Sequence, residues 1–422
     1  MHDAEELYRN RPERPRNPAS NQKLLTSAAA LWRLGPTFRA ATRVEGKIEN
    51  GHVATLVLRP SGDPSLGYAG LAALGEAMHL RGVDTVDRII IDDSYFDDQI
   101  LPPAFEQQPK EAAAFRAAIS AFAVNRNSYV VHISPGPKVD GPARVRVLAA
   151  DYVHIDNRTV TTEGGPPRPR IDHKLTGDGH LLVRVDGAIP RQVRTLYYRR
   201  RVPAPKAYAA SLLVRALKKA GVGGDLAVEY GAATEKQPLI ADMPSAPLSS
   251  LLYSLGKWSD NFTAEMILKI MGAQVQQPGT SAQGAIVVRE ELMKNGVDTE
   301  GLVMVNGSGL FDGNRVAPRH LTQTLVAAYR DSAIRAEYVA HLAVGGSDGT
   351  LKSRLKDLPR PRMVRAKTGT LKDVVALSGY VFGDQDRSVA FSFLANGVAG
   401  RQRDAKQLAD EIVRALANYA AP

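Results

Sequence analysis

The chain has 422 residues, which is enough for two or three domains with a large core. Hydrophobic residues make up 44% and charged residues 23%, as in ordinary soluble proteins, and no apolar run reaches the roughly 18 residues that suggest a transmembrane helix. Cysteine is absent, which excludes disulfides and cysteine-based zinc sites. The net charge of +10 suits binding to an anionic polymer such as cell wall. No nucleic-acid-binding motif accompanies the short basic clusters.

The first predicted element is a helix that follows Pro18 and ends at the Gly35-Pro36 break. Ser20 and Lys23 lie three positions apart near its start, so the Ser20 hydroxyl and the Lys23 amine can meet on the helix surface. A lysine activates a serine only if burial or neighbouring cations lower the lysine pKa. The pattern predicts a nucleophile and its base, with a helix-capping Ser20 and a solvated Lys23 as the alternative.

Short strands and a helix are predicted next. Residues 41–46 and 52–58 alternate apolar and polar side chains around Asn50-Gly51, which predicts a hairpin. A helix over 71–80 and a buried strand over 88–92 follow.

Residues 134–199 combine strand-like runs with Gly- and Pro-rich loops, which predicts a small β-rich module. His154 and His173 fall within it but lack metal-ligand spacing, so we expect them to be structural or solvated. No metal and no organic cofactor is predicted. A helix over 204–223 follows this module.

From about Pro244 the pattern is that of a larger α/β unit. Its predicted helices and strands cover 248–255, 262–271, 374–381 and 388–396. The turn Gly383-Asp384 is expected between the two strands. The chain ends in an amphipathic helix with an apolar stripe at Leu408, Ile412 and Leu416.

Two further motifs follow Ser20 in chain order. Ser-x-x-Lys alone is a weak signal, because it recurs at Ser254 and Ser353. However, Ser259-Asp260-Asn261 is the only Ser-x-Asn of the chain, and Lys367-Thr368-Gly369 is the only Lys-Thr-Gly. The three motifs in this order are a signature of class A β-lactamases and penicillin-binding proteins.

Other segments make the resemblance more specific. They include Asn17-Pro18-Ala19 before Ser20, the loop Gly62-Asp63-Pro64-Ser65-Leu66, Lys257-Trp258 and Ala264-Glu265-Met266 around the second motif, Asp348-Gly349-Thr350-Leu351, and the run 364–371. With these segments, nearly the whole chain resembles the D-alanyl-D-alanine carboxypeptidase/endopeptidase family, the low-molecular-mass class C penicillin-binding proteins of peptidase family S13.

The resemblance implies an α/β fold. A β-lactamase/transpeptidase-like domain, with an antiparallel sheet flanked by helices, would carry inserted accessory domains, the innermost of them β-rich. The expected boundaries are 1–36 and 238–422 for the catalytic domain, 37–133 and 200–237 for the accessory domain, and 134–199 for the β-rich insert.

The resemblance also implies a serine D,D-peptidase that cleaves D-Ala-D-Ala termini or D,D-cross-links of peptidoglycan stem peptides and is acylated by β-lactam antibiotics. Ser20 would be the nucleophile and Lys23 its base. Ser259 would relay the proton to the leaving amine, and Asn261 would hold the substrate amide. Lys367 would help to keep Lys23 neutral and to position Ser259 and the substrate.

Four further residues complete the implied substrate site. Thr368 would bind the substrate carboxylate, Gly369 would leave room for the peptide beside the strand, and Asp260 belongs to the second motif. The backbone N–H groups of Ser20 and Thr370 would form the oxyanion hole. The sequence does not indicate an oligomeric state.

Two features depart from the family pattern. Family members are normally exported, yet residues 1–6 are acidic and lack the apolar core of a secretory signal. We expect either a start placed too far downstream or a missing strand, and favour the first because a missing strand would expose a sheet edge. A periplasmic or extracytoplasmic location is therefore implied by the resemblance alone. Substrate preference depends on whether Lys110 or Glu111 occupies the position where some members carry an acidic residue.

Two other functions are open at this point. A β-lactamase or esterase needs a deacylation base, and Glu291 and Asn295 have the Glu-x-x-x-Asn spacing of class A enzymes, although they fit the end of an amphipathic helix better. A non-catalytic wall-binding protein would use the basic surface and a decayed site, but the intact set of three motifs argues against decay.

Overall fold

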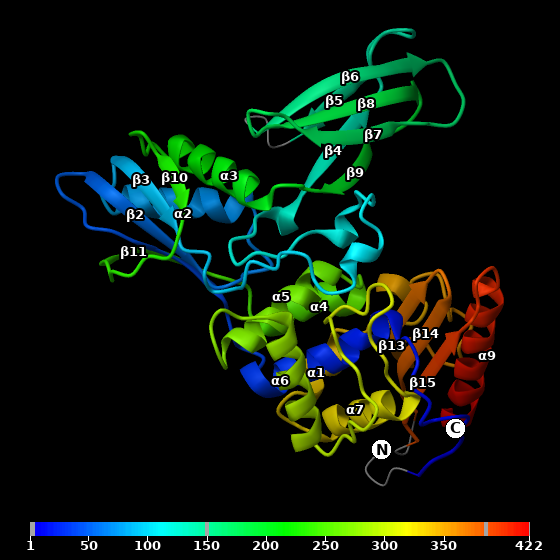
Figure 1. The fold of residues 1–422 in the computed structure, drawn as a ribbon. Helices are drawn as coiled ribbons and strands as arrows, with labels where there is room; N and C mark the ends of the chain where they lie inside the picture. Colours follow the sequence, from blue (N-terminus) through cyan, green and yellow to red (C-terminus); the bar gives the residue numbers. More distant parts are fainter. Residues whose placement is uncertain (1–4, 148–151, 384–386, 422) are drawn as a thin grey trace. The chain divides into compact units, whose positions relative to one another are not determined.

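The computed structural model describes residues 5–147, 152–383 and 387–421, in which the chain folds into two units (Figure 1). The terminal unit comprises Met1–Ala40, Ser94–Pro109 and Pro244–Pro422, and the inserted unit comprises Ala41–Asp93 and Lys110–Met243. No helix of the described ranges is long and apolar enough to cross a membrane.

The terminal unit is built on a four-stranded antiparallel sheet in the order β12-β13-β14-β15. The strands are β12 (Ala343–Val344), β13 (Val364–Leu371), β14 (Val374–Val381) and β15 (Val389–Asn396). The helices are η1 (Ala19–Asn21), α1 (Gln22–Leu34), η2 (Phe105–Gln107), α4 (Leu248–Lys257), α5 (Asn261–Ala273), α6 (Ser281–Lys294), α7 (Pro318–Arg330), α8 (Arg335–Ala340), η5 (Gly349–Leu351) and α9 (Gln402–Ala420). The antiparallel sheet flanked by helices agrees with the predicted architecture.

Helix α1 runs through the core of this unit, among α5, α6 and α7 (Figure 1). Every residue from Gln22 to Leu31 is buried, because apolar side chains on several sides of the helix pack against its neighbours. The short helix η1, which leads directly into α1, packs against β13 and β14. The helix therefore fixes Ser20 and Lys23 against the sheet.

Helix α9 forms as predicted, but of its predicted apolar stripe only Leu416 packs against the core, where it is partly buried. Leu408 and Ile412 are 50% and 38% exposed, whereas Ala409, Val413 and Ala417 are buried with the sheet residues of β13 and β14. Small side chains allow a helix to lie close to a sheet, and the larger leucines beside them then project outward. Of the predicted turn Gly383-Asp384, Asp384 lies outside the described residues.

The inserted unit contains a five-stranded sheet in the order β10-β3-β2-β1-β11. Its elements are β1 (Ala41–Glu45), β2 (His52–Pro60), α2 (Tyr68–Leu80), β3 (Thr85–Ile91), α3 (Pro205–Lys219), β10 (Ala227–Tyr230) and β11 (Leu239–Pro244). The predicted hairpin is confirmed, since β1 and β2 pair antiparallel. Asn50 and Gly51 both have positive φ (52° and 84°), as a tight hairpin turn requires.

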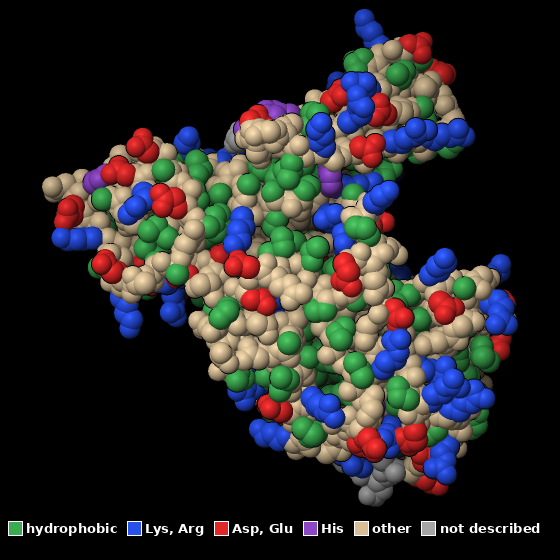
Figure 2. Space-filling view, viewed as in Figure 1, with side chains coloured by type: hydrophobic (Ala, Val, Ile, Leu, Met, Phe, Trp, Pro, Cys, Tyr) green, Lys and Arg blue, Asp and Glu red, His purple; other side chains and the backbone are tan. Residues whose placement is uncertain are grey.

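Two three-stranded sheets complete the inserted unit, in the orders β5-β4-β9 and β6-β8-β7. Their strands are β4 (Ser128–Ser134), β5 (Arg144–Val147), β6 (Val153–Thr162), β7 (Arg170–Leu175), β8 (Leu181–Pro190) and β9 (Leu196–Arg201). Two short helices, η3 (Ala114–Arg116) and η4 (Asn125–Asn127), precede them. Basic and acidic side chains intermingle on the outer surface of these strands (Figure 2). The separation of 134–199 as a domain of its own stays a prediction.

Residues Ser94–Pro109, which the sequence-based boundaries placed with the accessory region, pack in the terminal unit. The buried ammonium of Lys269 donates hydrogen bonds to Asp97 and to the Gln99 carbonyl (2.9 Å). Phe105 meets Phe311 edge to face, with ring centroids 5.8 Å apart. These long-range contacts have no local sequence signal.

Candidate active site

Ser20 and Lys23 meet as their spacing predicts. Lys23 Nζ lies 3.0 Å from Ser20 Oγ, and Ser20 sits in the short helix η1 that leads into α1. Ala19, the preceding residue, has a left-handed φ of 45°, which is strained for a non-glycine residue. Gly309 lies against the Ala19 carbonyl so closely that a Cβ there would be 1.9 Å from the oxygen. The loop around Gly309 therefore holds this turn in place.

The Lys23 ammonium is enclosed by acceptors. Besides Ser20, it donates to Asn261 Oδ1 and to the Ser308 carbonyl, both at 2.7 Å, and its side chain is fully buried. Burial lowers the pKa of Lys23 to about 7, while the negative charges of Glu265 and Asp260 oppose this shift. The resemblance implies that Lys367 helps to keep Lys23 neutral; in the structure, burial is the largest cause of the lowered Lys23 pKa.

Glu265 is a buried carboxylate at the site to which sequence reasoning assigned no role. Its two oxygens accept hydrogen bonds from the backbone N–H groups of Gly307 (3.0 Å) and Ser308 (2.8 Å). It thereby orients the Ser308 carbonyl that binds Lys23. Burial raises the pKa of Glu265, and the hydrogen bonds from Gly307 and Ser308 counteract that effect. Two sequence signals pointed to it: the segment Ala264-Glu265-Met266 belongs to the family resemblance, and Glu265 follows Asn261 by four residues, on the same face of α5.

The second and third motifs supply a second serine–lysine pair, Ser259 and Lys367. Lys367 Nζ donates to Ser259 Oγ at 2.9 Å and to the Thr368 carbonyl at 2.8 Å. Ser259 has a left-handed φ of 60°, which turns the chain just before α5. Burial and the charge of Lys23 place the pKa of Lys367 well below its usual value. Asn21 joins the two pairs, because its amide donates to the Lys367 carbonyl at 2.9 Å.

The predicted substrate-binding residues lie on or beside β13, except Asp260. Asp260 caps α5 by accepting the Thr263 N–H at 2.7 Å, so it supports the loop that carries Ser259. Thr368 Oγ1 donates to Thr350 Oγ1 at 2.8 Å. Gly369 lies against η1, where a Cβ would be 3.1 Å from the Pro18 carbonyl and from Ala19 Cβ. Thr370 follows on the same strand and is exposed.

Glu291 does not belong to the site. It lies in α6, which ends at Lys294 with Asn295 as its cap, as the helix-end interpretation predicted. Its carboxylate faces Arg33 at 3.7 Å, near the far end of α1. Ser20 precedes the opposite end of that helix, and thirteen residues at about 1.5 Å each separate the two positions by about 20 Å.

A half-buried serine paired with a buried lysine beside an antiparallel β-strand is typical of the penicillin-binding, transpeptidase-like serine enzymes. The structure is similar to that of penicillin binding protein 4 (dacB) from Haemophilus influenzae, with a TM-score of 0.80 and 23% identity over 96% of this chain and 93% of that one. A second structure of that protein, complexed with a novel β-lactam, gives a TM-score of 0.75. The predicted fold class is thus confirmed.

Sequence comparison identifies the family. The family model "D-Ala-D-Ala carboxypeptidase 3 (S13) family" matches residues 1–419. A D-alanyl-D-alanine carboxypeptidase from Actinomadura sp. (strain R39) is 35% identical over 435 residues, covering 99% of this chain and 79% of the relative. D-alanyl-D-alanine carboxypeptidase DacB from Haemophilus influenzae is 26% identical over 407 residues, 92% of this chain and 82% of that one. The chain belongs to the D-Ala-D-Ala carboxypeptidase 3 (S13) family, and the resemblance stated from the motifs is confirmed.

Proposed function

We propose that this serine-type carboxypeptidase cleaves the D-Ala-D-Ala ends or the D,D-cross-links of peptidoglycan stem peptides through an acyl-enzyme on Ser20. The observation that carries the proposal is the fully buried Lys23 amine, with a pKa of about 7, at 3.0 Å from the Ser20 hydroxyl. Family membership supports the reaction class. The substrate class follows from the names of the relatives.

In the first step, Ser20 Oγ attacks the carbonyl carbon between the two D-alanines while its proton moves to neutral Lys23. The carbonyl becomes an oxyanion, which the N–H groups of Ser20 and Thr370 stabilise; one such donor typically contributes about 3 kcal/mol. Asn261 and the Ser308 carbonyl hold the Lys23 amine in place for this transfer.

In the second step, the C–N bond breaks and the leaving D-alanine amine takes up a proton. Ser259 supplies that proton, because Lys367 Nζ holds its hydroxyl at 2.9 Å in the loop that precedes Asn261. Ser259 is reprotonated from Lys23, so that the net proton transfer runs from Ser20 to the leaving amine. Water then attacks the ester, and Ser20 leaves with its proton restored.

The substrate lies along β13 as an added strand. Strand β12 pairs with β13 only at Arg365 and Ala366, whereas β14 pairs along its whole length. A peptide placed beside Lys367–Thr370 would meet backbone groups of the strand, and Thr368 and Lys367 would bind its terminal carboxylate. Gly369 keeps the strand close to Ala19, so the carbonyl carbon is brought to Ser20.

The same geometry accounts for inhibition by β-lactams. A β-lactam acylates Ser20 when its ring opens, and the opened ring keeps the leaving group attached, so water is slow to release the ester. The β-lactamase alternative lacks support, because Glu291 lies near the far end of α1 from Ser20. The peptidoglycan substrate places the reaction outside the cytoplasm, in the periplasm or cell wall. The roles of Lys110 and Glu111 in substrate preference stay predictions.

The test is intact-mass spectrometry after incubation with benzylpenicillin, on the wild type and on Ser20→Ala. We expect one adduct of the penicillin mass in the wild type, slow loss of that adduct, and no adduct in the variant. Equal melting temperatures would show that Ser20→Ala folds. An adduct retained in the variant would refute Ser20 as nucleophile, and rapid turnover of penicillin would favour the β-lactamase function instead.

A further inference from the structure

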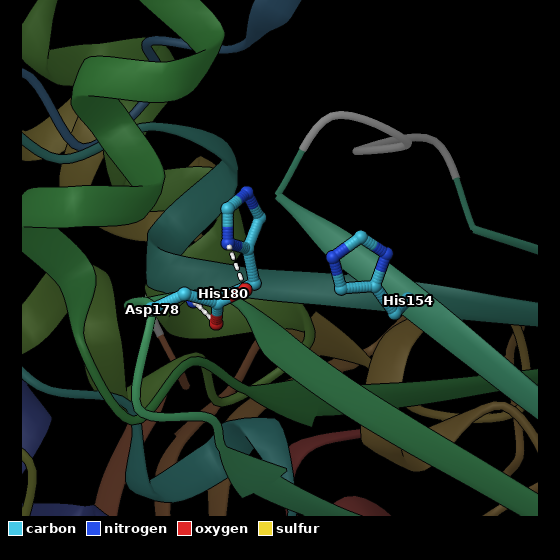
Figure 3. A group of neighbouring side chains, drawn as sticks. All are labelled: His154, Asp178 and His180. Carbon is cyan, nitrogen blue, oxygen red and sulfur yellow. Dashed lines mark hydrogen bonds and ion pairs between the residues drawn. The ribbon is translucent and has the colours of Figure 1, made fainter.

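Three metal-ligating side chains gather at one end of the β6-β8-β7 sheet in the inserted unit (Figure 3). His154, Asp178 and His180 each offer one ligand atom, and these atoms all lie within 4.8 Å of one another. The two imidazole rings lie side by side, with their centroids 4.8 Å apart. The three residues belong to the inserted unit, whereas the serine site is built from residues of the terminal unit.

Strand pairing brings the two histidines together across 26 positions of sequence. Strands β6 and β8 run parallel, with His154 opposite Leu182. His180 precedes Leu182 by two residues, and alternation along the strand places it on the face that carries His154. This is why sequence spacing, which considered His154 with His173, gave no metal signal.

The turn before β8 orients Asp178. Its Oδ1 accepts hydrogen bonds from the Thr176 hydroxyl and from the His180 N–H (3.4 Å). Oδ2 lies 3.3 Å from Nδ1 of His180. That nitrogen is buried and, within the described residues, has no hydrogen-bond partner. One carboxylate oxygen is thus used to fix the turn, while the other lies at ion-pair distance from the buried Nδ1 of His180.

The spacing fits an ion shared by these two atoms. Zinc binds imidazole nitrogen and carboxylate oxygen at about 2.0–2.2 Å in tetrahedral geometry, which separates two ligands by about 3.4 Å. The Asp178–His180 pair already has this separation. His154 is exposed, so a side-chain rotation can bring its nitrogen from within 4.8 Å to the same distance.

We propose that His154, Asp178 and His180 bind one zinc ion, with water as the fourth ligand. Two imidazoles and one carboxylate suit a borderline-soft divalent ion better than calcium or magnesium, which prefer oxygen alone. The ion joins β6 to the β7–β8 turn and stabilises the sheet, because it binds the folded state.

The proposal is tested on the full chain, stripped with a chelator, by calorimetric titration with zinc chloride and by thermal melting. We expect one stoichiometric zinc site and a zinc-dependent rise of a few degrees in the melting temperature of the inserted unit. The double variant His154→Gln/His180→Gln should lose both, although its metal-free melting temperature stays at the wild-type value. Asp178→Asn should weaken binding at least about tenfold.

The matched control is His52→Gln. His52 faces Asp87 at 3.3 Å at the start of β2, and no second histidine joins this pair among the metal-ligating groups of the described residues. This variant should bind zinc as the wild type does. Wild-type stoichiometry in the double variant, loss of zinc binding in His52→Gln, or no stoichiometric binding by the wild type would each overturn the proposal. Cobalt(II) provides a second readout, since tetrahedral ligation gives a visible absorption band that only the wild type and the control should show.

Discussion

The serine site of the terminal unit and the β6-β8-β7 sheet of the inserted unit place their ionisable side chains in opposite environments. In the terminal unit, Lys23, Glu265 and Lys367 are at most 1% exposed and form a connected network with polar backbone groups. On the β6-β8-β7 sheet of the inserted unit, Asp156 lies between Arg158 (3.0 Å) and Arg184 (3.2 Å) in contact with solvent. Burying charged groups costs free energy. Buried networks with shifted pKa values are therefore found mainly at functional sites, where the shifted pKa values serve a reaction.

The two environments also differ in how strongly they depend on single residues. Each atom of the buried network has a fixed partner, so the loss of one leaves the others unsatisfied. Exposed ion pairs compete with water and contribute little. Four experiments test this difference, from the largest expected effect to the smallest.

Lys23→Met should show the largest effect. Methionine has a volume similar to that of lysine, but the substitution removes the base next to Ser20. General-base catalysis typically raises a reaction rate by about 10²–10⁴-fold. We expect penicillin acylation to slow by about 10³-fold, measured by intact mass over time. Lys257→Met is the control, since Lys257 is also buried but pairs with Asp348 at 2.8 Å and belongs to the second Ser-x-x-Lys. Acylation at the wild-type rate in Lys23→Met would contradict the assignment of the base.

The pH dependence of the wild type should come next. Lys23 accepts a proton only when it is neutral, and its pKa is about 7. The neutral fraction therefore rises about tenfold between pH 6 and pH 8, and the second-order acylation rate should rise with it. Stopped-flow measurement with a chromogenic β-lactam gives this profile. A rate that is flat, or that falls over this interval, would contradict a neutral Lys23 as base.

Glu265→Gln should have a smaller and more specific effect. The negative charge of Glu265 raises the pKa of Lys23, so its removal should lower that pKa and move the midpoint of the acylation profile to lower pH. We also expect a several-fold lower maximal rate, because the Ser308 carbonyl loses part of its support. Glu265→Asp keeps the charge and should leave the midpoint near that of the wild type. A purely structural role would lower the rate at every pH without moving the midpoint.

Asp156→Asn should have the smallest effect. The substitution breaks the exposed pairs with Arg158 and Arg184. We expect no measurable change in acylation and a melting temperature within experimental error of the wild type. Arg158→Gln should behave alike. A clear loss of stability in either variant would mean that the exposed charges are coupled more strongly than surface ion pairs usually are.

Local sequence patterns predicted much of this structure, and the predictions that failed did so for physical reasons. The α1 helix, the β1–β2 hairpin and the Ser20–Lys23 contact follow from spacing and turn chemistry, which act over a few residues. The prediction of the buried face of α9 was largely wrong. The helix packs closely on the sheet through the smaller Ala409 and Val413, and the larger Leu408 is exposed. The role of Glu265 and the approach of His154 to His180 depend on partners far along the chain.

The division of the terminal unit along the chain has a consequence during synthesis. Helix α1 belongs to Met1–Ala40, but most of its packing partners come after Pro244, about 200 residues later. At about 5–20 residues per second, a ribosome needs roughly 10–40 s to make that interval. Throughout this time the apolar sides of α1 have few native partners, and the nascent chain presents them to the cell. The inserted unit can fold first, whereas the terminal unit completes its core only after α5 and β13 have emerged.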